Sequence, residues 1–459
     1  MASSYPPPSP GAPAPTHTRI PTRQLPPLTP FPLPAELPTL PSPPRTSPFP
    51  EYVLSTHLTP CARPRASPTS TTRRVRPAYP PSVAEEGSIT PEARGKRAEV
   101  VERLTKRMWE QWEEVSRAPS WETQDVKEGE REREPQLWAV VNRFLRREQT
   151  GRGVTLFLAH SNGIPKETWE PLVGMVLQRY PVDEVLVWET FNHGDAALVN
   201  AAHLGDTYDW VDNTRDVLQF LTYHRPLTAA AAPVHLPLHE REAQPRKVIG
   251  LGHSYGGEIL LRAAVYSPQL FSCLIAVEAL AVPPHAYAGK GWDMLRRTTL
   301  SRRSVWPSLA DARASFLRSP FFKNWHPAVF HAYVTHALHA HPSSPGAVAL
   351  KQSPYDEVVC YFNPPSPAET WALLPELDEA VELRWVMGRD PGTFTGGEEC
   401  VGETVWRRRR RASNVRLREA GHFIPQEAPE LLAREVVDVL LRLHGPPAQK
   451  ARGQVQARL

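Results

Sequence analysis

Ser254 stands at the centre of the pentapeptide Gly252-His253-Ser254-Tyr255-Gly256, where a strand-like sequence meets a helix-like one. The apolar run Val248–Leu251 precedes it, and an apolar stripe at helical spacing follows over residues 259–264. A serine on such a tight turn projects its hydroxyl, and glycines two positions before and after it let the two backbones pass closely. The pattern therefore predicts a nucleophilic serine. Such a serine needs a base to accept its proton and an acid to orient that base.

The candidate base is His422, in the segment REAGHFIPQEAPELL. A short apolar run, Val415–Leu417, precedes it, and an amphipathic helical pattern follows it. A residue between the last strand and the last helix lies at the carboxyl edge of a parallel sheet, where Ser254 is also expected. We therefore expect the two side chains to meet there.

Two carboxylates compete for the role of the orienting acid. Glu278 ends the apolar run that follows the nucleophile helix, and Asp390 lies just past the next run. Both positions are at strand ends, so either side chain can reach the far imidazole nitrogen. The residue pattern alone does not choose between them.

Acyl transfer also needs two N–H donors for the charge that develops on the carbonyl oxygen. One is expected from the backbone of Tyr255, directly after the nucleophile. The other is expected from the loop His160-Ser161-Asn162-Gly163, with Asn162 as the first choice and Gly163 as the second.

Short apolar runs that alternate with helix-forming segments provide the frame for these residues. Such alternation predicts a mostly parallel sheet covered by helices, an α/β fold. Residues 283–380 separate the fourth and fifth runs and are expected to form a helical cap over the carboxyl ends of the strands. Tyr52–Thr59 predicts an earlier strand, and we expect the charged segment 74–134 to form a surface helix or an excursion between early strands. The six runs are Val154–Ala159, Val185–Trp188, Val248–Leu251, Leu274–Val277, Leu383–Met387 and Val415–Leu417.

Proline divides the chain into parts. Of 459 residues 52 are proline, and 25 of these lie in the first hundred positions, where polyproline conformations are favoured and helices are not. We expect a disordered Pro-rich extension over residues 1–50, a folded domain over 51–445 and a flexible tail over 446–459.

Charge and cysteine content exclude several function classes. Lys plus Arg is 53 and Asp plus Glu is 49, so the net charge of +4 gives no strong argument for nucleic acid. The four cysteines are widely spaced, which suits a reducing compartment and offers no metal-ligand cluster. No apolar run is long enough to span a bilayer, and the first residues lack the pattern of a secretory signal. We expect no metal, no cofactor, no nucleic-acid partner and no membrane span.

Several longer segments resemble one protein family. They are STHLTPCARPR, AHSNGIPKETWEPL, NHGDAALVNAAHLGDTYDWVDNTRDVLQFL, VIGLGHSYGG and EAGHFIPQEAPE. The chain from about residue 50 to 445 resembles the α/β-hydrolases of fungal toxin and secondary-metabolite biosynthesis, a group that includes peroxisomal acyl-CoA hydrolases.

The resemblance implies an α/β-hydrolase fold and a serine hydrolase that cleaves an ester or thioester through an acyl-enzyme. The substrate would be a small molecule such as an acyl-CoA or a secondary-metabolite ester. The resemblance also implies Glu278 as the acid. The family commonly carries Asp at that place, so Asp390 stays open as the alternative.

The C-terminal triplet Ala457-Arg458-Leu459 is of the S-K-L type that a peroxisomal import receptor recognises. It predicts a peroxisomal location, with the cytoplasm as the alternative.

Two other functions compete with the serine hydrolase. An epoxide hydrolase or dehalogenase shares the fold but uses a carboxylate nucleophile. A non-catalytic scaffold would use its Pro-rich head to recruit SH3- or WW-like partners.

Three further features have both a functional and a structural interpretation. The run Arg407–Arg411 would meet coenzyme A phosphates or form a solvated loop. His193 and Asp195 would border the pocket or shape a turn. The cap aromatics Trp306, Phe321, Phe322 and Trp325 would line an apolar pocket or fill a core.

Overall fold

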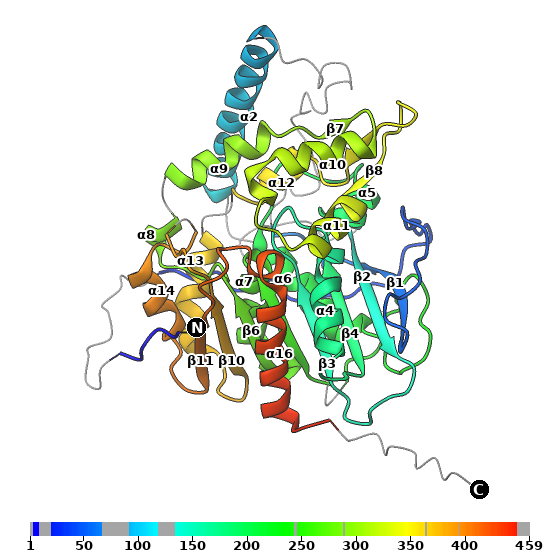
Figure 1. The fold of residues 1–459 in the computed structure, drawn as a ribbon, viewed down its shortest axis with the longest axis vertical. Coiled ribbons are helices and arrows are strands. Elements are labelled where there is room, and N and C mark those ends of the chain that lie inside the picture. Colours follow the sequence, from blue (N-terminus) through cyan, green and yellow to red (C-terminus); the bar gives the residue numbers. More distant parts are fainter. Residues whose placement is uncertain are drawn as a thin grey trace, which may run out of the picture.

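A mixed eight-stranded sheet is the frame of the molecule in this computed structural model (Figure 1). The structure describes residues 3–8, 20–66, 91–117, 134–242, 246–287, 290–362, 365–392 and 394–447. The strand order is β1-β2-β4-β3-β5-β6-β10-β11, antiparallel at the β1-β2-β4 end and parallel from β4 onward. The strands are β1 (Tyr52–Pro60), β2 (Trp138–Arg146), β3 (Thr155–Ala159), β4 (Glu184–Glu189), β5 (Val248–His253), β6 (Phe271–Val277), β10 (Glu382–Met387) and β11 (Ala412–Arg416).

Every apolar run predicted to be a strand forms one, within a few residues at either end. Strand β2 was missed by the sequence analysis. Its sequence WAVVNRFLR places Asn142 and Arg143 in the middle of an otherwise apolar stretch. Both are buried, and the Arg143 guanidinium is paired with Glu184 at 2.7 Å, so the charge is compensated by a neighbouring strand.

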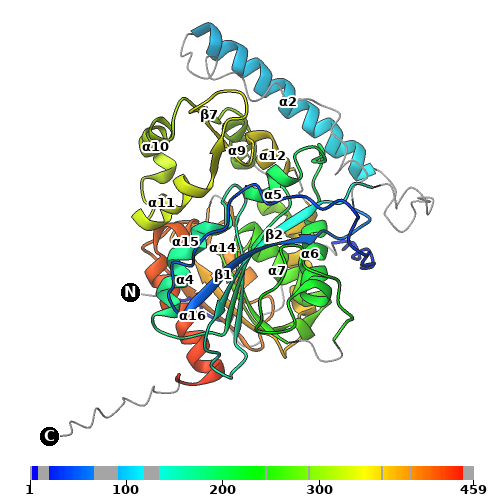
Figure 2. The ribbon, with the colours of Figure 1, turned by 90° about the vertical axis from the view of Figure 1, so that its right-hand side faces the viewer.

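Helices cover both faces of the sheet, and each face has its own apolar core (Figures 1 and 2). Helices α4 (Glu170–Leu177) and α16 (Pro429–His444) cover one face, and the other carries α6 (Trp210–Gln219), α7 (Tyr255–Tyr266) and α13 (Pro365–Leu373). Smaller helices complete the shell: α5 (Gly194–Val199), α8 (Pro284–Tyr287), α14 (Glu398–Val405) and α15 (Ile424–Glu427).

Residues 290–362, most of the chain between β6 and β10, form a cap above the carboxyl ends of the parallel strands (Figure 1). Helix α13, also within the predicted cap range 283–380, packs instead on the sheet face against α7. The helices of the cap are α9 (Lys290–Leu300), α10 (Leu309–Arg318), α11 (Pro327–His336) and α12 (Pro354–Val359). The cap also contains a small antiparallel sheet, which the sequence did not predict: β7 (Val305–Trp306), β9 (Val348–Leu350) and β8 (Leu338–Ala340). Helix α2 (Pro91–Arg117), expected as a surface helix, packs against α9.

Residues 20–50 of the Pro-rich head run along the domain (Figure 2), and the predicted disorder of residues 1–50 stays a prediction. The Arg23 side chain pairs with Asp209 and with Glu369. The buried Arg215 donates to the carbonyls of Pro26 and Pro27 at 3.1 Å each. Proline cannot donate a backbone hydrogen bond, but its carbonyl still accepts one, so a buried arginine can hold a Pro-rich chain in place.

Two sequence predictions concern the chain ends and membranes. The triplet Ala457-Arg458-Leu459 lies outside the described residues. Within the ranges that the structure describes, no helix combines the length and hydropathy needed to cross a bilayer.

Candidate active site

Ser254 occupies a strained turn between β5 and α7. Its φ of 56° and ψ of −120° lie where a residue with a side chain is seldom found. The flanking glycines permit this turn. A Cβ on Gly252 would lie 2.6 Å from the Gly256 carbonyl oxygen, and a Cβ on Gly256 would lie 2.5 Å from the Ala159 and His160 oxygens. The turn presents the Ser254 hydroxyl at the carboxyl edge of the sheet.

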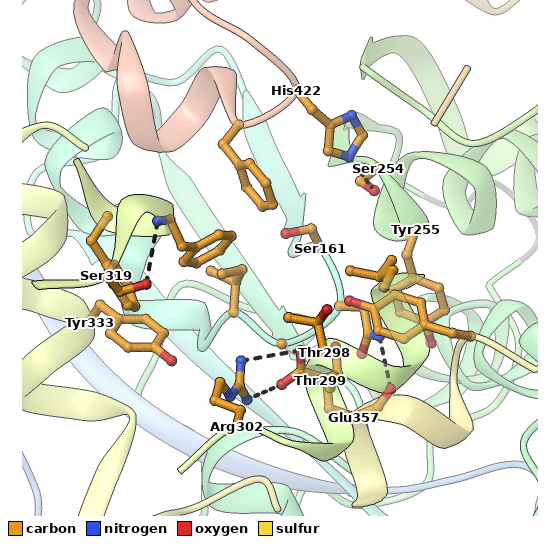
Figure 3. Close-up of a pocket in the computed structure, with 18 of the residues that line it drawn as sticks. Ser161, Ser254, Tyr255, Thr298, Thr299, Arg302, Ser319, Tyr333, Glu357 and His422 are labelled. Atoms are coloured by element: carbon orange, nitrogen blue, oxygen red, sulfur yellow. Dashed lines mark hydrogen bonds and ion pairs between the residues drawn. The ribbon is translucent and has the colours of Figure 1, made fainter. Parts of the chain in front are cut away.

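A chain of hydrogen bonds links Ser254, His422 and Glu278. Ser254 Oγ lies 2.9 Å from His422 Nε2, and His422 Nδ1 lies 3.0 Å from Glu278 Oε2. Figure 3 shows the imidazole of His422 directly beside Ser254. The second Glu278 oxygen accepts the Gly388 N–H at 2.5 Å, which fixes the plane of the carboxylate. This arrangement can pass a proton from the serine to the imidazole, with the carboxylate stabilising the resulting cation.

Asp390 is not part of this chain. Its side chain is 65% exposed and is paired with its neighbour Arg389 at 3.0 Å. Glu278, in contrast, is buried, and its backbone adopts a φ of 47° that turns the side chain toward His422. The structure thus brings one of the two candidate carboxylates to the imidazole and leaves the other at the surface.

The histidine that precedes the nucleophile supports this geometry. His253 is buried, and its Nε2–H donates to the backbone carbonyl of His422 at 2.8 Å. Burial lowers the pKa of His253 well below its ordinary value, so its ring stays neutral. His253 therefore holds the loop that carries His422 without adding a charge beside it.

The loop after β3 lies opposite the nucleophile and contains the second predicted N–H donor. Asn162 lines the cavity beside Ser254 and Tyr255. Its side chain is turned to the cap, where Nδ2 donates to the Glu357 carbonyl at 3.0 Å. What Asn162 can offer a substrate is its backbone N–H. Helix α7 begins at Tyr255, so the Tyr255 N–H has no acceptor within the helix.

The structure contradicts the second choice, in which the Gly163 N–H would bind the oxyanion. The Gly163 N–H donates to His193 Nε2 at 3.1 Å, so it is already engaged. Burial lowers the pKa of His193 well below its ordinary value, which leaves a neutral ring able to accept that bond. His193 therefore shapes the loop. Asp195 pairs with Lys351 at 2.6 Å and lies outside the cavity wall.

A cavity of about 470 Å³ opens from these residues toward the cap. Aromatic side chains supply much of its wall, among them Trp292, Trp306, Phe316, Phe321, Phe322 and Phe394. Of the four cap aromatics singled out in the sequence, Trp306, Phe321 and Phe322 line the cavity, and Trp325 packs in the aromatic cluster behind it. The size and lining suit a small organic substrate.

Sequence reasoning missed two features of this cavity. One is Ser161, whose buried hydroxyl lines the cavity and has no hydrogen-bond partner among the described residues (Figure 3). The other is the ion pair between Arg302 and Glu357, which joins two cap segments at the cavity wall. Neither feature can be predicted from the local sequence, because each depends on residues distant in the chain.

The basic run Arg407–Arg411 lies far from the cavity. It immediately precedes β11, so it is at the amino edge of the parallel strands, whereas Ser254 is at the carboxyl edge. Arg407 stacks on Trp371 with its guanidinium carbon 3.6 Å from the ring centre, and Arg410 pairs with Glu379. This position at the opposite edge of the sheet favours the structural interpretation of the run.

The structure also bears on metals and thiols. Across the described ranges, no group of three or more His, Cys, Asp or Glu side chains is placed to hold a metal ion. The four cysteines are buried and form no disulfide.

Comparison with known proteins places this geometry in a family. A family model described as the alpha/beta hydrolase family matches residues 156–435, well over half of the chain. The peroxisomal membrane protein LPX1 of Saccharomyces cerevisiae is 30% identical over 142 residues, which are 30% of this chain and 33% of that protein. The type I acyl-CoA thioesterase mpaH of Penicillium roqueforti is 29% identical over 160 residues, 34% of this chain and 33% of that protein. The abhydrolase domain-containing protein AKT2 of Alternaria alternata is 32% identical over 121 residues, 26% of this chain and 45% of that protein.

These alignments span about a third to somewhat under half of each relative. An alignment of three-dimensional structures covers a larger share of both chains than these sequence alignments do. The crystal structure of the Saccharomyces cerevisiae peroxisomal alpha-beta-hydrolase Lpx1 aligns with a TM-score of 0.58 and 17% identity, over 86% of this chain and 90% of that one. The family match and the structural likeness confirm the predicted α/β-hydrolase fold. The family match and the sequence relatives confirm the resemblance to fungal hydrolases.

Proposed function

The chain belongs to the alpha/beta hydrolase family, and we propose that it is a serine hydrolase that cleaves an ester or thioester through an acyl-enzyme. The observation on which the proposal rests is the hydrogen-bonded chain from Ser254 through His422 to Glu278 at the wall of the cavity. A serine hydroxyl becomes nucleophilic when a base within hydrogen-bond reach accepts its proton, and the 2.9 Å contact with His422 meets that requirement.

In the first half of the reaction, Ser254 Oγ attacks the carbonyl carbon while His422 Nε2 takes the serine proton. Glu278 accepts the Nδ1–H and stabilises the imidazolium. The backbone N–H groups of Tyr255 and Asn162 bind the oxyanion. The tetrahedral intermediate then expels the alcohol or thiol, which takes the proton from His422.

In the second half, His422 deprotonates a water molecule that attacks the acyl-serine carbonyl. The same two N–H groups bind the second oxyanion. Collapse of that intermediate releases the acid, and His422 returns the proton to Ser254 Oγ. Neither half of this reaction requires a metal or an organic cofactor.

We propose an acyl-CoA or a secondary-metabolite ester as the substrate and the peroxisome as the location. A thioester is supported by the relative named as a type I acyl-CoA thioesterase. The peroxisome is supported by the relative named as a peroxisomal protein and by the triplet Ala457-Arg458-Leu459, which an import receptor would bind. The rival epoxide-hydrolase or dehalogenase chemistry needs a carboxylate nucleophile, and the residue hydrogen-bonded to His422 Nε2 is a serine.

Replacement of the nucleophile tests the proposal. We expect Ser254→Ala to reduce kcat on p-nitrophenyl esters and acyl-CoA thioesters by about 10³-fold or more, with an unchanged circular-dichroism spectrum. The matched control is Ser343→Ala, at an exposed serine in a cap loop. Equal turnover by the parent and Ser254→Ala on every substrate that the parent cleaves would overturn the proposal.

A further inference from the structure

The end of the cavity away from the nucleophile is polar. Figure 3 places Ser254 and His422 on one side of the cavity, and Arg302, Thr298 and Thr299 on the other. Arg302 follows α9, and its ion-pair partner Glu357 is in α12. A cavity that bound only hydrocarbon chains would be lined by apolar side chains, because burying a polar group against a hydrocarbon costs free energy.

Two donors at this end have no partner in the described part of the chain. The Trp306 side chain lines the cavity and is only 1% exposed, and its indole Nε1–H makes no hydrogen bond. The Arg302 Nε–H makes none either. Trp306 stacks edge-on against Phe316, which in turn contacts Tyr333 on the same side of the cavity as Arg302 (Figure 3). A buried donor left without an acceptor is costly, so each is a candidate contact for a ligand.

The charged groups at this end are the Arg302–Glu357 ion pair and Arg303. The Arg303 guanidinium lies 5.8 Å from the Trp306 ring centre, and its Nε–H donates to the Val305 carbonyl at 2.7 Å. The Arg302 side chain is 32% exposed and that of Glu357 is 6% exposed, so the arginine is the more accessible member of the pair. The carboxylate neutralises it, and the pair has no net charge. A neutral oxygen can accept from Arg302 or Trp306 without meeting repulsion, whereas a second carboxylate would lie close to Glu357.

The acyl part of the substrate is the part that reaches this end. A leaving group such as coenzyme A carries several phosphate charges, which the aromatic wall between Ser254 and Arg302 cannot solvate. An acyl group with an apolar middle and an oxygen near its far end matches both the wall and the donors.

We propose that this end of the cavity, defined by Trp306, Arg302 and Glu357, binds a neutral oxygen function on the acyl group, such as a hydroxyl or a keto carbonyl. The inference rests on the proposed ester or thioester hydrolysis at Ser254. It makes the enzyme selective for oxygenated acyl groups over plain alkyl chains of the same length.

The test measures kcat/KM for matched acyl-CoA thioesters: a plain fatty acyl chain, its keto and hydroxy derivatives with the oxygen placed at successive positions, and the dicarboxylic derivative. We expect the best keto or hydroxy substrate to exceed the plain chain by about tenfold or more, as one hydrogen bond to a charged or buried donor would give. The dicarboxylic substrate should fall below the neutral oxygenated one.

Variants connect this preference to the site. Trp306→Phe removes the N–H and keeps an aromatic ring, and the ratio of oxygenated to plain turnover should fall severalfold. The double variant Arg302→Met, Glu357→Gln removes both charges together, so that neither is left buried and unpaired, and should also lower the ratio. The control is Trp325→Phe, because Trp325 is a buried tryptophan of the same aromatic cluster that does not line the cavity. It should leave the ratio unchanged.

Failure of this inference is distinguishable from failure of the proposed function. If the parent hydrolyses the plain thioester through Ser254 but shows no preference for oxygenated chains, or prefers the dicarboxylic one, the inference alone is wrong. Retention of the full preference in both cavity variants also overturns it. If no ester or thioester is cleaved, the inference falls together with the proposed function.

Discussion

The replacement Glu278→Gln tests the role of the buried carboxylate most sharply. Glu278 Oε1 accepts the Gly388 N–H at 2.5 Å, and Oε2 lies 3.0 Å from His422 Nδ1. In the glutamine variant, the amide oxygen remains the acceptor for Gly388, so the amide NH₂ faces Nδ1. The imidazole must then present Nδ1 as an acceptor and carry its proton on Nε2, which points at Ser254 Oγ. An imidazole in that tautomer cannot accept the serine proton.

The expected loss is about 10³-fold or more in kcat, equivalent to about 4 kcal/mol of transition-state stabilisation. The control is Asp390→Asn. The Asp390 side chain is 65% exposed and is paired with Arg389, and an exposed ion pair contributes little. We expect this variant to stay within about twofold of the parent.

The assay is steady-state hydrolysis of a p-nitrophenyl ester, with thermal unfolding of each variant to show that it is folded. A large loss in Asp390→Asn together with near-parental activity in Glu278→Gln would refute the reasoning and assign the role to Asp390. Equal and small losses in both would mean that neither carboxylate orients His422.

Two further predictions concern the oxyanion loop and a buried carboxyl. Gly163 and Gly151 both have positive φ, but a Cβ on Gly163 would lie 2.8 Å from the Glu357 carboxyl group and one on Gly151 would meet nothing within 4 Å. We expect Gly163→Ala to lower kcat about tenfold or more by shifting the loop, and Gly151→Ala to affect only stability, as esterase kinetics and urea unfolding would show; equal kcat values would contradict this. Burial raises the pKa of Glu258 to about 8. Between the ordinary pKa of a glutamate and pH 8, the folded state therefore holds a proton on Glu258 that the unfolded state has released. The free energy of unfolding falls as the pH rises toward 8. Glu258→Gln should therefore gain stability relative to the parent between pH 5 and pH 8, by at most about 1.4 kcal/mol per pH unit, and a difference that does not change with pH in urea titrations would disprove the assignment.

The sequence predicts the parallel part of the fold well, because strands buried on both faces must be apolar and their runs stand out. It gives no signal where the position of a segment depends on partners distant in the chain. Strand β2 contains a charged residue that Glu184 compensates, and the Pro-rich head is held by Arg215 and by the pairs of Arg23. None of these partners can be found from local pattern.

The site residues also fall into those that the local sequence predicts and those that it does not. Ser254 and His422 lie in motifs whose glycines and flanking elements predict their position. The choice of acid stayed open because a carboxylate follows each of two strands, and it depends on which way the chain turns after each strand. Glu278 adopts a φ of 47° and points at the imidazole, whereas Asp390 points to solvent beside Arg389.

Mass spectrometry of the covalent intermediate tests the central claim most directly. The parent, quenched during turnover of a slow ester substrate, should carry the mass of one acyl group, and peptide mapping should place it on Ser254. His422→Ala should form this adduct far more slowly, and Ser254→Ala should form none. An acyl group on any other residue, or an adduct that persists in Ser254→Ala, would contradict the account.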